Sequence, residues 1–142
     1  MVKELRVFID NKPGRLKAVT SILSKNNLNI HAVSVQTREN FGLIKMLVDK
    51  PEDAYLELTN YGLACTIKEI FAIKIEDKPG GLDKILTVFV DNNINIKDSF
   101  AFVIEPNKYA VLCIEIEEIE KAKEILLENG VKLLKNQDFY EL

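Results

Sequence analysis

Two copies of one short motif constrain this chain more than any other feature of its sequence. The segment NKPGRL occupies residues 11–16, and DKPGGL occupies residues 77–82, which is 66 residues later. The same offset places NNLNI at residues 26–30 on NNINI at residues 92–96, so that 8 of the 20 positions from 11 to 30 are identical in the two copies. A repeat of this length indicates two similar structural units that follow one another in the chain.

Each copy is predicted to open with a strand and a helix on either side of the Pro-Gly turn. Apolar residues alternate with others in residues 5–9 and again in residues 71–75, as in a strand that is buried on one face. Pro-Gly then favours the start of a helix, and apolar residues follow at helical spacing. Asn-Asn ends each helix, because asparagine tolerates the left-handed conformation found at helix C-termini.

The remaining segments complete a βαββαβ order in both copies. Second strands are predicted at residues 29–37 and 95–104, third strands at 43–49 and 109–116, second helices near 51–61 and 117–129, and fourth strands at 64–69 and 131–135. The second helices end at Tyr61-Gly62 and Asn129-Gly130, an offset of 68, so we expect a two-residue insertion in the second copy between Asp49 and Gly130. The predicted fold class is α+β, with two tandem ferredoxin-like domains, residues 1–69 and 70–142. In each domain an antiparallel sheet carries both helices on one face.

Composition and charge exclude several classes of function. The formal net charge is −3, with 19 Lys and Arg against 22 Asp and Glu, so no basic excess is available for nucleic acid. The N-terminus reads as a strand without signal-peptide features, and no apolar run approaches the length that spans a bilayer. We therefore expect a cytoplasmic protein with neither nucleic acid nor membrane as a partner.

Catalytic and metal-binding patterns are absent from the sequence. Cys65 and Cys113 lie in apolar stretches, and His31 is the only histidine, so no set of zinc ligands appears at short spacing. We interpret both cysteines as small buried hydrophobic residues. No phosphate-binding loop, GxSxG, HExxH or other nucleophile with a base partner can be recognised. We expect no metal, no cofactor and no enzymatic activity.

The turn between the first strand and the first helix of each copy is the best candidate ligand site. Gly14 and Gly80 allow a ligand to approach the backbone, and the unpaired amides of a first helical turn suit a carboxylate. Asn11 can donate or accept hydrogen bonds, and Asp77 could pair with an ammonium group. Asn or Asp before Pro-Gly is equally the ordinary chemistry of a tight turn, and spacing alone favours neither interpretation.

The (N/D)KPG(R/G)L turn, the helix and the NN(L/I)NI block, repeated in register, resemble a tandem ACT-domain protein over the whole chain. The resemblance implies a regulatory module that binds an amino acid at these turns, near a domain interface. Carried over residue by residue, it implicates as ligand-binding residues Asn11, Lys12, Gly14, Arg15, Leu16, Asn29, Asp77, Gly80, Gly81, Leu82 and Asn95. Asn29 and Asn95, at the entry to the second strands, are expected near the turns.

The partners expected are a small-molecule ligand of the amino-acid class and a second copy of the chain in a homodimer. An alternative function is that of a non-catalytic regulatory subunit, which acts through protein–protein contact with a metabolic enzyme. Phe100 and Phe102 favour the alternative, since with Ala101 and Val103 they make the second strand of the second copy apolar on both faces.

Overall fold

The computed structural model describes residues 1–140, which form two compact units. The first unit consists of residues 3–68, and the second unit consists of residues 1–2 and the chain from residue 69 onward. The βαββαβ order predicted from the repeat is confirmed in both units. The fold class is therefore α+β, with antiparallel sheets.

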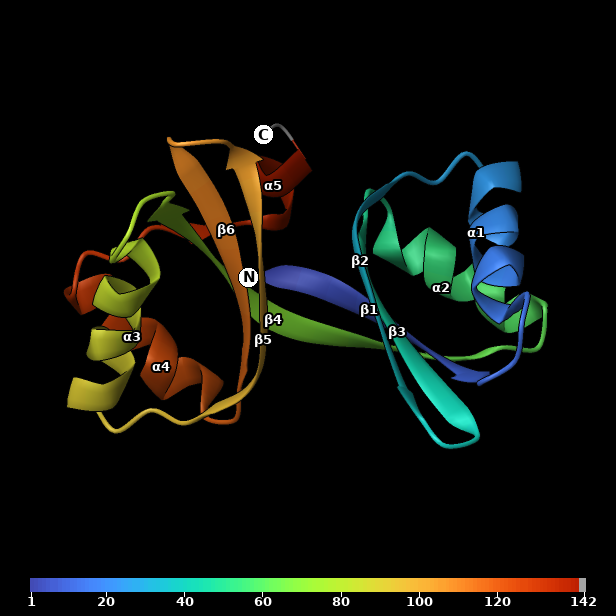
Figure 1. Ribbon diagram of the computed structural model, residues 1–142, viewed down its shortest axis with the longest axis horizontal. Coiled ribbons are helices and arrows are strands. Elements are labelled where there is room, and N and C mark those ends of the chain that lie inside the picture. The colour runs from blue at the N-terminus through green and yellow to red at the C-terminus, as the bar shows by residue number, and fades with distance from the viewer. Residues whose placement is uncertain (141–142) are drawn as a thin grey trace. The chain divides into compact units, whose positions relative to one another are not determined.

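The first unit contains β1 (Val2–Asp10), α1 (Arg15–Lys25), β2 (Ile30–Arg38), β3 (Phe41–Val48), α2 (Pro51–Asn60) and the start of β4 (Ala64–Glu76). Its strands lie in the order β2-β3-β1-β4. Helices α1 and α2 lie side by side on one face of this sheet (Figure 1). Between helices and sheet lies a core that includes Leu5, Val7, Val19, Leu23, Ile44, Met46 and Leu58, all fully buried.

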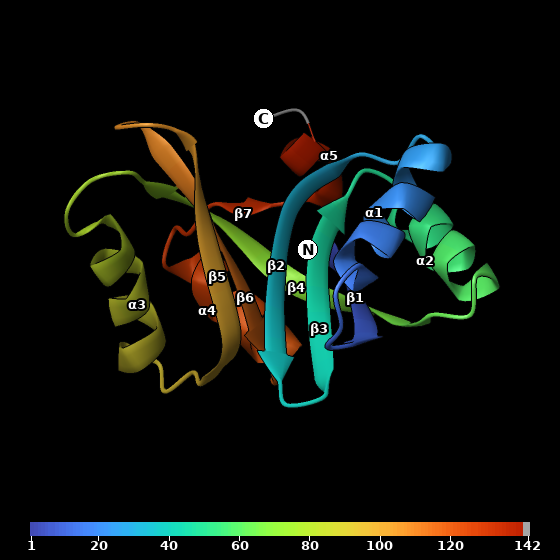
Figure 2. The same cartoon turned by 45° about the vertical axis from the view of Figure 1, so that its right-hand side comes forward.

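The second unit contains the rest of β4, α3 (Gly81–Asp91), β5 (Ile96–Glu105), β6 (Tyr109–Ile116), α4 (Ile119–Glu128), β7 (Leu133–Leu134) and α5 (Asn136–Tyr140). Its strands lie in the order β5-β6-β4-β7. Helices α3 and α4 cover one face of the sheet, as Figure 2 also shows. Their core includes Phe71, Ile73, Phe89, Ile114, Ala122 and Leu126.

Strand β4 passes through the predicted domain boundary at Glu69 without a break. The segments predicted as the fourth strand of one copy and the first strand of the next, 64–69 and 71–75, are one strand of 13 residues. The same strand thus supplies the fourth strand of the first sheet and the first strand of the second.

The repeated Asn-Asn pairs end α1 and α3 by the same geometry. The side-chain amides of Asn26 and Asn92 each donate to the carbonyl four residues earlier, at 2.8 Å. Asn27 and Asn93 then adopt left-handed backbone conformations, with φ 55° and 53°. The NN(L/I)NI block is therefore explained by helix termination and chain reversal.

The two-residue insertion lies earlier in the chain than predicted. Four residues, 38–41, separate Thr37 from Gly42 in the first unit, whereas six residues, 104–109, separate the equivalent Val103 and Ala110. The extra residues form a register shift between Val103 and Glu105 and a longer turn. In the second copy the expected interval runs from residue 115, which is 66 residues after Asp49, to Gly130. The insertion lies before this interval, since α2 and α4 already differ by the full offset of 68 at their first residues.

Helix α5 was not foreseen from the sequence, and it gives one of the aromatic residues of β5 a partner within the chain. The rings of Phe102 and Phe139 meet edge to face with centroids 5.8 Å apart, and Phe139 is 3% exposed. Phe102 pairs with Val111, a neighbour of the core residue Leu112, and so points away from α3 and α4. Strand β5 is apolar on both faces in part because Phe102, on the face away from α3 and α4, packs against α5.

Candidate functional site

The two strand-to-helix turns have nearly the same backbone geometry. Gly14 and Gly80 both have φ 87°, in the left-handed region, and each is the N-terminal cap residue of the helix that follows. A Cβ built on either glycine would meet no atom within 4 Å. Glycine is favoured here by the positive φ and not by crowding.

The first turn of each helix has no side-chain cap. Arg15 N donates to the Lys12 carbonyl at 3.4 Å, and Ala18 N donates to the Gly14 carbonyl at 2.9 Å. No side-chain hydrogen bond caps α1 or α3 among the residues that the structure describes. The amides of Leu16 and Lys17, and of Leu82 and Asp83, therefore remain to donate to a ligand or to water.

Asn11 and Asp77 use their side chains to join each turn to the hairpin of the same unit. The Asn11 Nδ2 donates to the Glu39 carbonyl at 2.9 Å, and the Asp77 Oδ2 accepts a hydrogen bond from the Asn107 amide at 2.7 Å. These contacts support the interpretation of both residues as turn-forming. The Oδ1 atoms of Asn11 and Asp77 take no part in these bonds, and each could accept a hydrogen bond from a ligand.

Gly81 and Arg15 occupy equivalent positions and make the two turns different. A Cβ on Gly81 would lie 2.1 Å from the Glu76 carbonyl oxygen, so no other residue fits without movement of the backbone. Arg15 instead carries an exposed guanidinium 3.7 Å from the Asp10 carboxylate. The turn of the second unit is also tighter, because Gly81 N donates to the Lys78 carbonyl at 3.0 Å.

The two turns differ more in their charged residues than in their backbone geometry. Around the start of α1, residues 10–17 include three cations, Lys12, Arg15 and Lys17, and one anion, Asp10. The equivalent residues 76–83 include one cation, Lys78, and three anions, Glu76, Asp77 and Asp83. The first turn of α1 contains no acidic residue, whereas that of α3 contains Asp83. Over these residues, the charge at the first turn favours a carboxylate more than the charge at the second turn does.

Of the sequence-predicted residues, Asn29 and Asn95 are not brought together with the turns. Asn29 follows the C-terminal end of α1, where its amide donates to the Asp49 Oδ1 at 3.1 Å. Asn95 holds the equivalent place after α3. An 11-residue helix is about 16 Å long and separates each asparagine from its turn, which corrects the expected proximity. The other predicted residues, Asn11 to Leu16 and Asp77 to Leu82, do cluster at the two turns.

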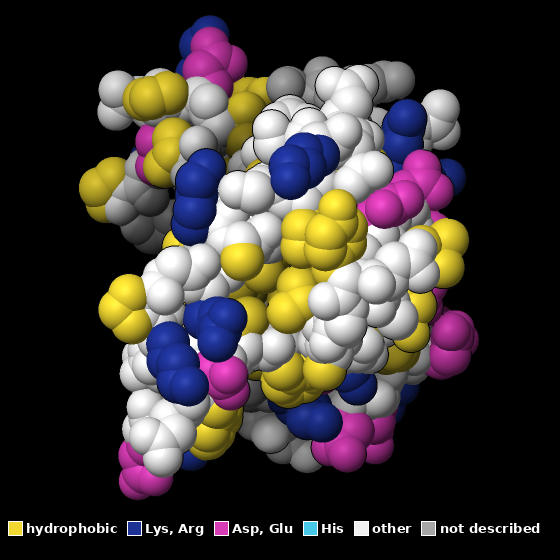
Figure 3. Space-filling model, turned by 90° about the vertical axis from the view of Figure 1, so that its right-hand side faces the viewer, with side chains coloured by type: hydrophobic (Ala, Val, Ile, Leu, Met, Phe, Trp, Pro, Cys, Tyr) yellow, Lys and Arg dark blue, Asp and Glu magenta, His cyan; other side chains and the backbone are white. Residues whose placement is uncertain are grey.

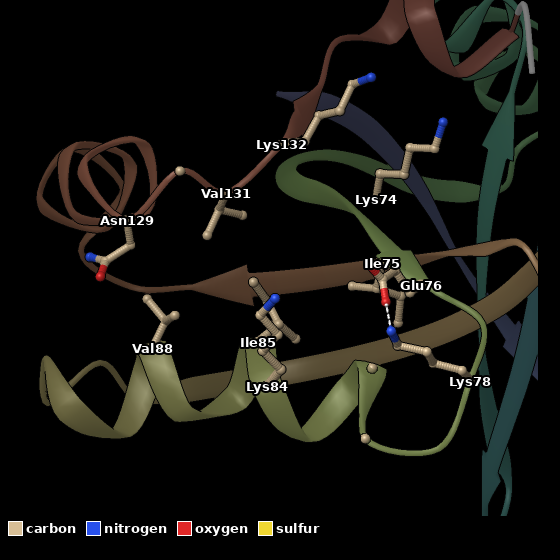
Figure 4. Close-up of a pocket in the computed structure, with 13 residues that line it drawn as sticks. Lys74, Ile75, Glu76, Lys78, Lys84, Ile85, Val88, Asn129, Val131 and Lys132 are labelled. Carbon is tan, nitrogen blue, oxygen red and sulfur yellow. Dashed lines mark ion pairs between the residues drawn. The ribbon is translucent and has the colours of Figure 1, made fainter.

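A cavity of about 360 Å³ lies in the second unit between α3, the end of β4 and the turn from α4 to β7. Figure 4 shows Ile85 and Val88 of α3 facing Val131 across it. Four lysines line it, together with Glu76, Gly80 and Gly81: Lys74, Lys78, Lys84 and Lys132. No local pattern in the sequence groups these lysines, because Lys74, Lys84 and Lys132 belong to three separate segments.

A neighbouring lysine shifts the pKa of one carboxyl group beside the second turn, and burial shifts the pKa of a thiol in the first unit. The hydrogen bond and charge of Lys78 lower the pKa of the Glu76 carboxyl, which is fully exposed. Burial raises the pKa of the Cys65 thiol, and a hydrogen bond with Thr59 partly offsets this effect.

Within residues 1–140 no three His, Cys, Asp or Glu side chains lie close enough together to hold a metal ion. None of the helices in the same residues has the length and apolar character needed to span a membrane.

The family model of the ACT domain pair matches residues 1–142. The chain belongs to this family. A solved structure of a protein from Bacteroides thetaiotaomicron is similar at 32% identity, with 99% of this chain and 96% of that chain covered and a TM-score of 0.92. A search of curated proteins gave no match.

More distant solved structures share the fold of the ACT domain pair. The regulatory subunit of aspartate kinase from Thermus thermophilus, in its ligand-free form, is similar at 14% identity, with 89% and 91% of the two chains covered and a TM-score of 0.64. The corresponding subunit from Thermus flavus is similar at 14% identity, with 87% of each chain covered and a TM-score of 0.59. ACT domains are a family of ligand-binding regulatory domains, and this pair has that regulatory fold.

Proposed function

We propose that this ACT domain pair is a sensor that binds an amino acid at its strand-to-helix turns and has no catalytic activity of its own. The domains, as proposed, are residues 1–69 and 70–142. The observation that carries the proposal is a glycine with φ 87° followed by a helix whose first turn has no side-chain cap, found once in each unit. Such a turn offers backbone amides to a carboxylate without rearrangement.

The first unit is the stronger candidate for the carboxylate of an amino acid. The amides of Leu16 and Lys17 would donate to the carboxylate, and the Arg15 and Lys17 side chains add positive charge. The Asn11 Oδ1 lies on a side chain already fixed by its bond to Glu39, so it could accept a hydrogen bond from the ammonium group at little entropic cost. Leu16, 39% exposed, provides apolar surface beside these groups.

We also assign the second turn to the ligand site, but with a different role from that of the first turn. Asp77, Gly80, Gly81 and Leu82 repeat the geometry, but three carboxylates in residues 76–83 favour the ammonium end of a ligand over its carboxylate. The two turns would then be non-equivalent, and an amino acid would occupy the first at lower concentration.

A thermal-shift screen against the common amino acids tests this proposal. A ligand that binds only the folded state stabilises it by about 2.7 kcal/mol at a hundredfold excess over its dissociation constant. A hit is then titrated by calorimetry into the wild-type chain and into Arg15→Ala, with Lys25→Ala at the other end of α1 as the control for lost charge. We expect weaker binding only in Arg15→Ala; a complete screen without any stabilising amino acid would contradict the proposal.

A second candidate function is that of a non-catalytic regulatory subunit of a metabolic enzyme. Apolar side chains are exposed on the helix side of the first unit, with Leu56 57% and Tyr61 60% exposed. Figure 3 shows hydrophobic side chains between charged ones on this side.

Edge strand β2 also exposes Val33 and Val35, which supports the proposed homodimer. Sedimentation of the chain alone would show a dimer or a monomer directly.

A further inference from the structure

We propose that the cavity between α3, the end of β4 and the α4–β7 turn binds a small aliphatic monocarboxylate. Its volume, about 360 Å³, lies at the lower end of the range for small-molecule sites. All the residues that line it belong to the second unit, so the cavity is complete within one folded unit.

Three residues around the cavity are smaller than their counterparts in the first copy. With the offsets of 66 and 68 residues found above, Gly81, Val88 and Val131 correspond to Arg15, Ile22 and Leu63. Ile22 is buried in the first unit, whereas Val88 is only partly buried. The second unit thus leaves accessible an apolar surface that the first unit covers with larger side chains.

The floor of the cavity is apolar. Its lining includes Ile75, Ile85, Val88 and Val131, and each of these packs, partly buried, against the core of the second unit. Figure 4 shows Ile85 and Val88 rising from α3 toward Val131. An aliphatic chain in contact with these side chains would remove their remaining apolar surface from water.

Lys84 supplies a cation at one end of this apolar floor. It lies four residues before Val88, so that both side chains stand on the same side of α3, about 6 Å apart along the helix axis. In Figure 4 the Lys84 side chain rises from α3 beside Ile85, on the cavity side of the helix. A carboxylate at Lys84 therefore places a short aliphatic chain along Ile85 and Val88.

The other lysines of the lining add little to this charge. Lys78 pairs with Glu76, and the ammonium groups of Lys74 and Lys132 point away from α3 (Figure 4). Among the residues that the structure describes, Lys84 is the lining lysine that combines a side chain on the cavity side with no carboxylate at ion-pair distance. One such cation fits a ligand with a single carboxylate.

The edge of β4 offers a backbone donor to the same cavity. Along a strand, successive amides point to opposite sides: Asp77 N donates to the Lys108 carbonyl of the β5–β6 hairpin, and Lys74 N donates to the Lys132 carbonyl. The Glu76 amide therefore points to the side of Lys132, but β7 pairs with β4 only before this point. A carboxylate in the cavity can accept the hydrogen bond of this amide.

This inference is independent of amino-acid binding at the first turn, although the cavity shares Gly80 and Gly81 with the second turn. Either proposal can fail alone, because they concern different residues and different variants. Amino acids and Arg15 test the first proposal, and an aliphatic acid and Lys84 test the other.

The test follows the backbone amides of the uniformly ¹⁵N-labelled full chain by NMR during titration with pentanoate at low ionic strength. The variant Lys84→Ala introduces the residue found at the equivalent position 18, and Val131→Leu introduces the residue found at position 63 and narrows the cavity. The control Lys123→Ala removes the same charge from α4, outside the cavity lining. Circular dichroism and thermal unfolding confirm that the three variants are folded.

We expect saturable shifts of the Glu76, Ile85 and Val131 amides, with an affinity about fivefold lower in Lys84→Ala, lower also in Val131→Leu and unchanged in the control. Acetate, which lacks the chain, and pentanol, which lacks the carboxylate, should both bind more weakly than pentanoate.

Three results would overturn the proposal. Saturable shifts at Leu16 and Lys17 alone, or none at all, would remove pentanoate from the cavity. Equal affinities of Lys84→Ala and Lys123→Ala, or an affinity that Val131→Leu leaves unchanged, would show that these side chains do not form the site. Equal affinity for acetate or pentanol would overturn its assignment to an aliphatic monocarboxylate.

Discussion

Gly81 lies so close to Glu76 that a Cβ on the glycine would be 2.1 Å from the glutamate carbonyl oxygen. This contact fixes the first residue of α3 against the end of β4. The equivalent residue of the first unit, Arg15, has its side chain in solvent. Equivalent positions of the two copies thus differ: position 81 admits only glycine, whereas position 15 admits a long side chain.

Replacement of Gly81 by alanine should therefore destabilise the chain. Because the clash is with backbone, the turn must shift, and we expect a loss of about 1–3 kcal/mol in the free energy of unfolding measured in urea. Arg15→Ala is the matched control at the equivalent position and should change it by less than about 0.5 kcal/mol. Similar values for the two variants would show that the close contact does not hold in solution.

The bond between Asp77 and the Asn107 amide should contribute measurably to stability. Asp77→Ala leaves the amide without its acceptor, and we expect a loss of about 1 kcal/mol, whereas Asp77→Asn keeps an oxygen and should lose less. Asn11→Ala is the counterpart in the first unit, where the bond to the Glu39 carbonyl is lost. Urea unfolding of the three variants gives the comparison. If alanine and asparagine at position 77 cost the same, the hydrogen bond is not the cause.

The sequence was sufficient for the element order, because the signals that set it are local. Pro-Gly and Asn-Asn act through backbone conformation within a few residues, and both helices of each unit begin and end near the predicted positions. The insertion was misplaced because it consists of a register shift near Ile104 and one extra turn residue, and neither has a composition signal. Helix α5 depends on a contact between Phe102 and Phe139 that no local pattern shows.

The candidate site was only partly predictable for the same reason. The turns could be found because their residues are consecutive. Asn29 and Asn95 were expected beside them, but the length of the intervening helix places them at its other end. The residues that line the cavity belong to separate segments and come together only in the folded unit.

Modification of Cys65 should show the raised pKa of its thiol. Burial disfavours the thiolate, so alkylation of the native chain by iodoacetamide should require higher pH than alkylation in denaturant. The linked contribution to stability is complete below the pKa of the unfolded thiol and is lost as the pH rises through the higher pKa of the folded one. Mass spectrometry separates Cys65 from Cys113, which is 1% exposed. Coincident pH profiles in the native and denatured chain would contradict the shift.

Lys17→Asp should separate ligand binding from stability. Asp83 stands at the equivalent position, and an acidic residue in the first turn stabilises a helix by about 0.3–1 kcal/mol. We therefore expect thermal stability to be unchanged or raised while affinity for an amino acid falls about tenfold, since the carboxylate now meets an anion. Calorimetry and thermal unfolding of one preparation give both quantities. A variant that binds the ligand as the wild type does would remove the first turn from the site.

The most direct test of the account follows the backbone amides of the uniformly ¹⁵N-labelled chain by NMR during titration with the amino acid that stabilises it most. If the carboxylate binds at the start of α1, the resonances of Leu16 and Lys17 should shift among the most, with saturation, and should do so at lower ligand concentration than those of Leu82 and Asp83. Saturable shifts that leave all four of these amides unchanged would contradict the central claim that the strand-to-helix turns hold the ligand.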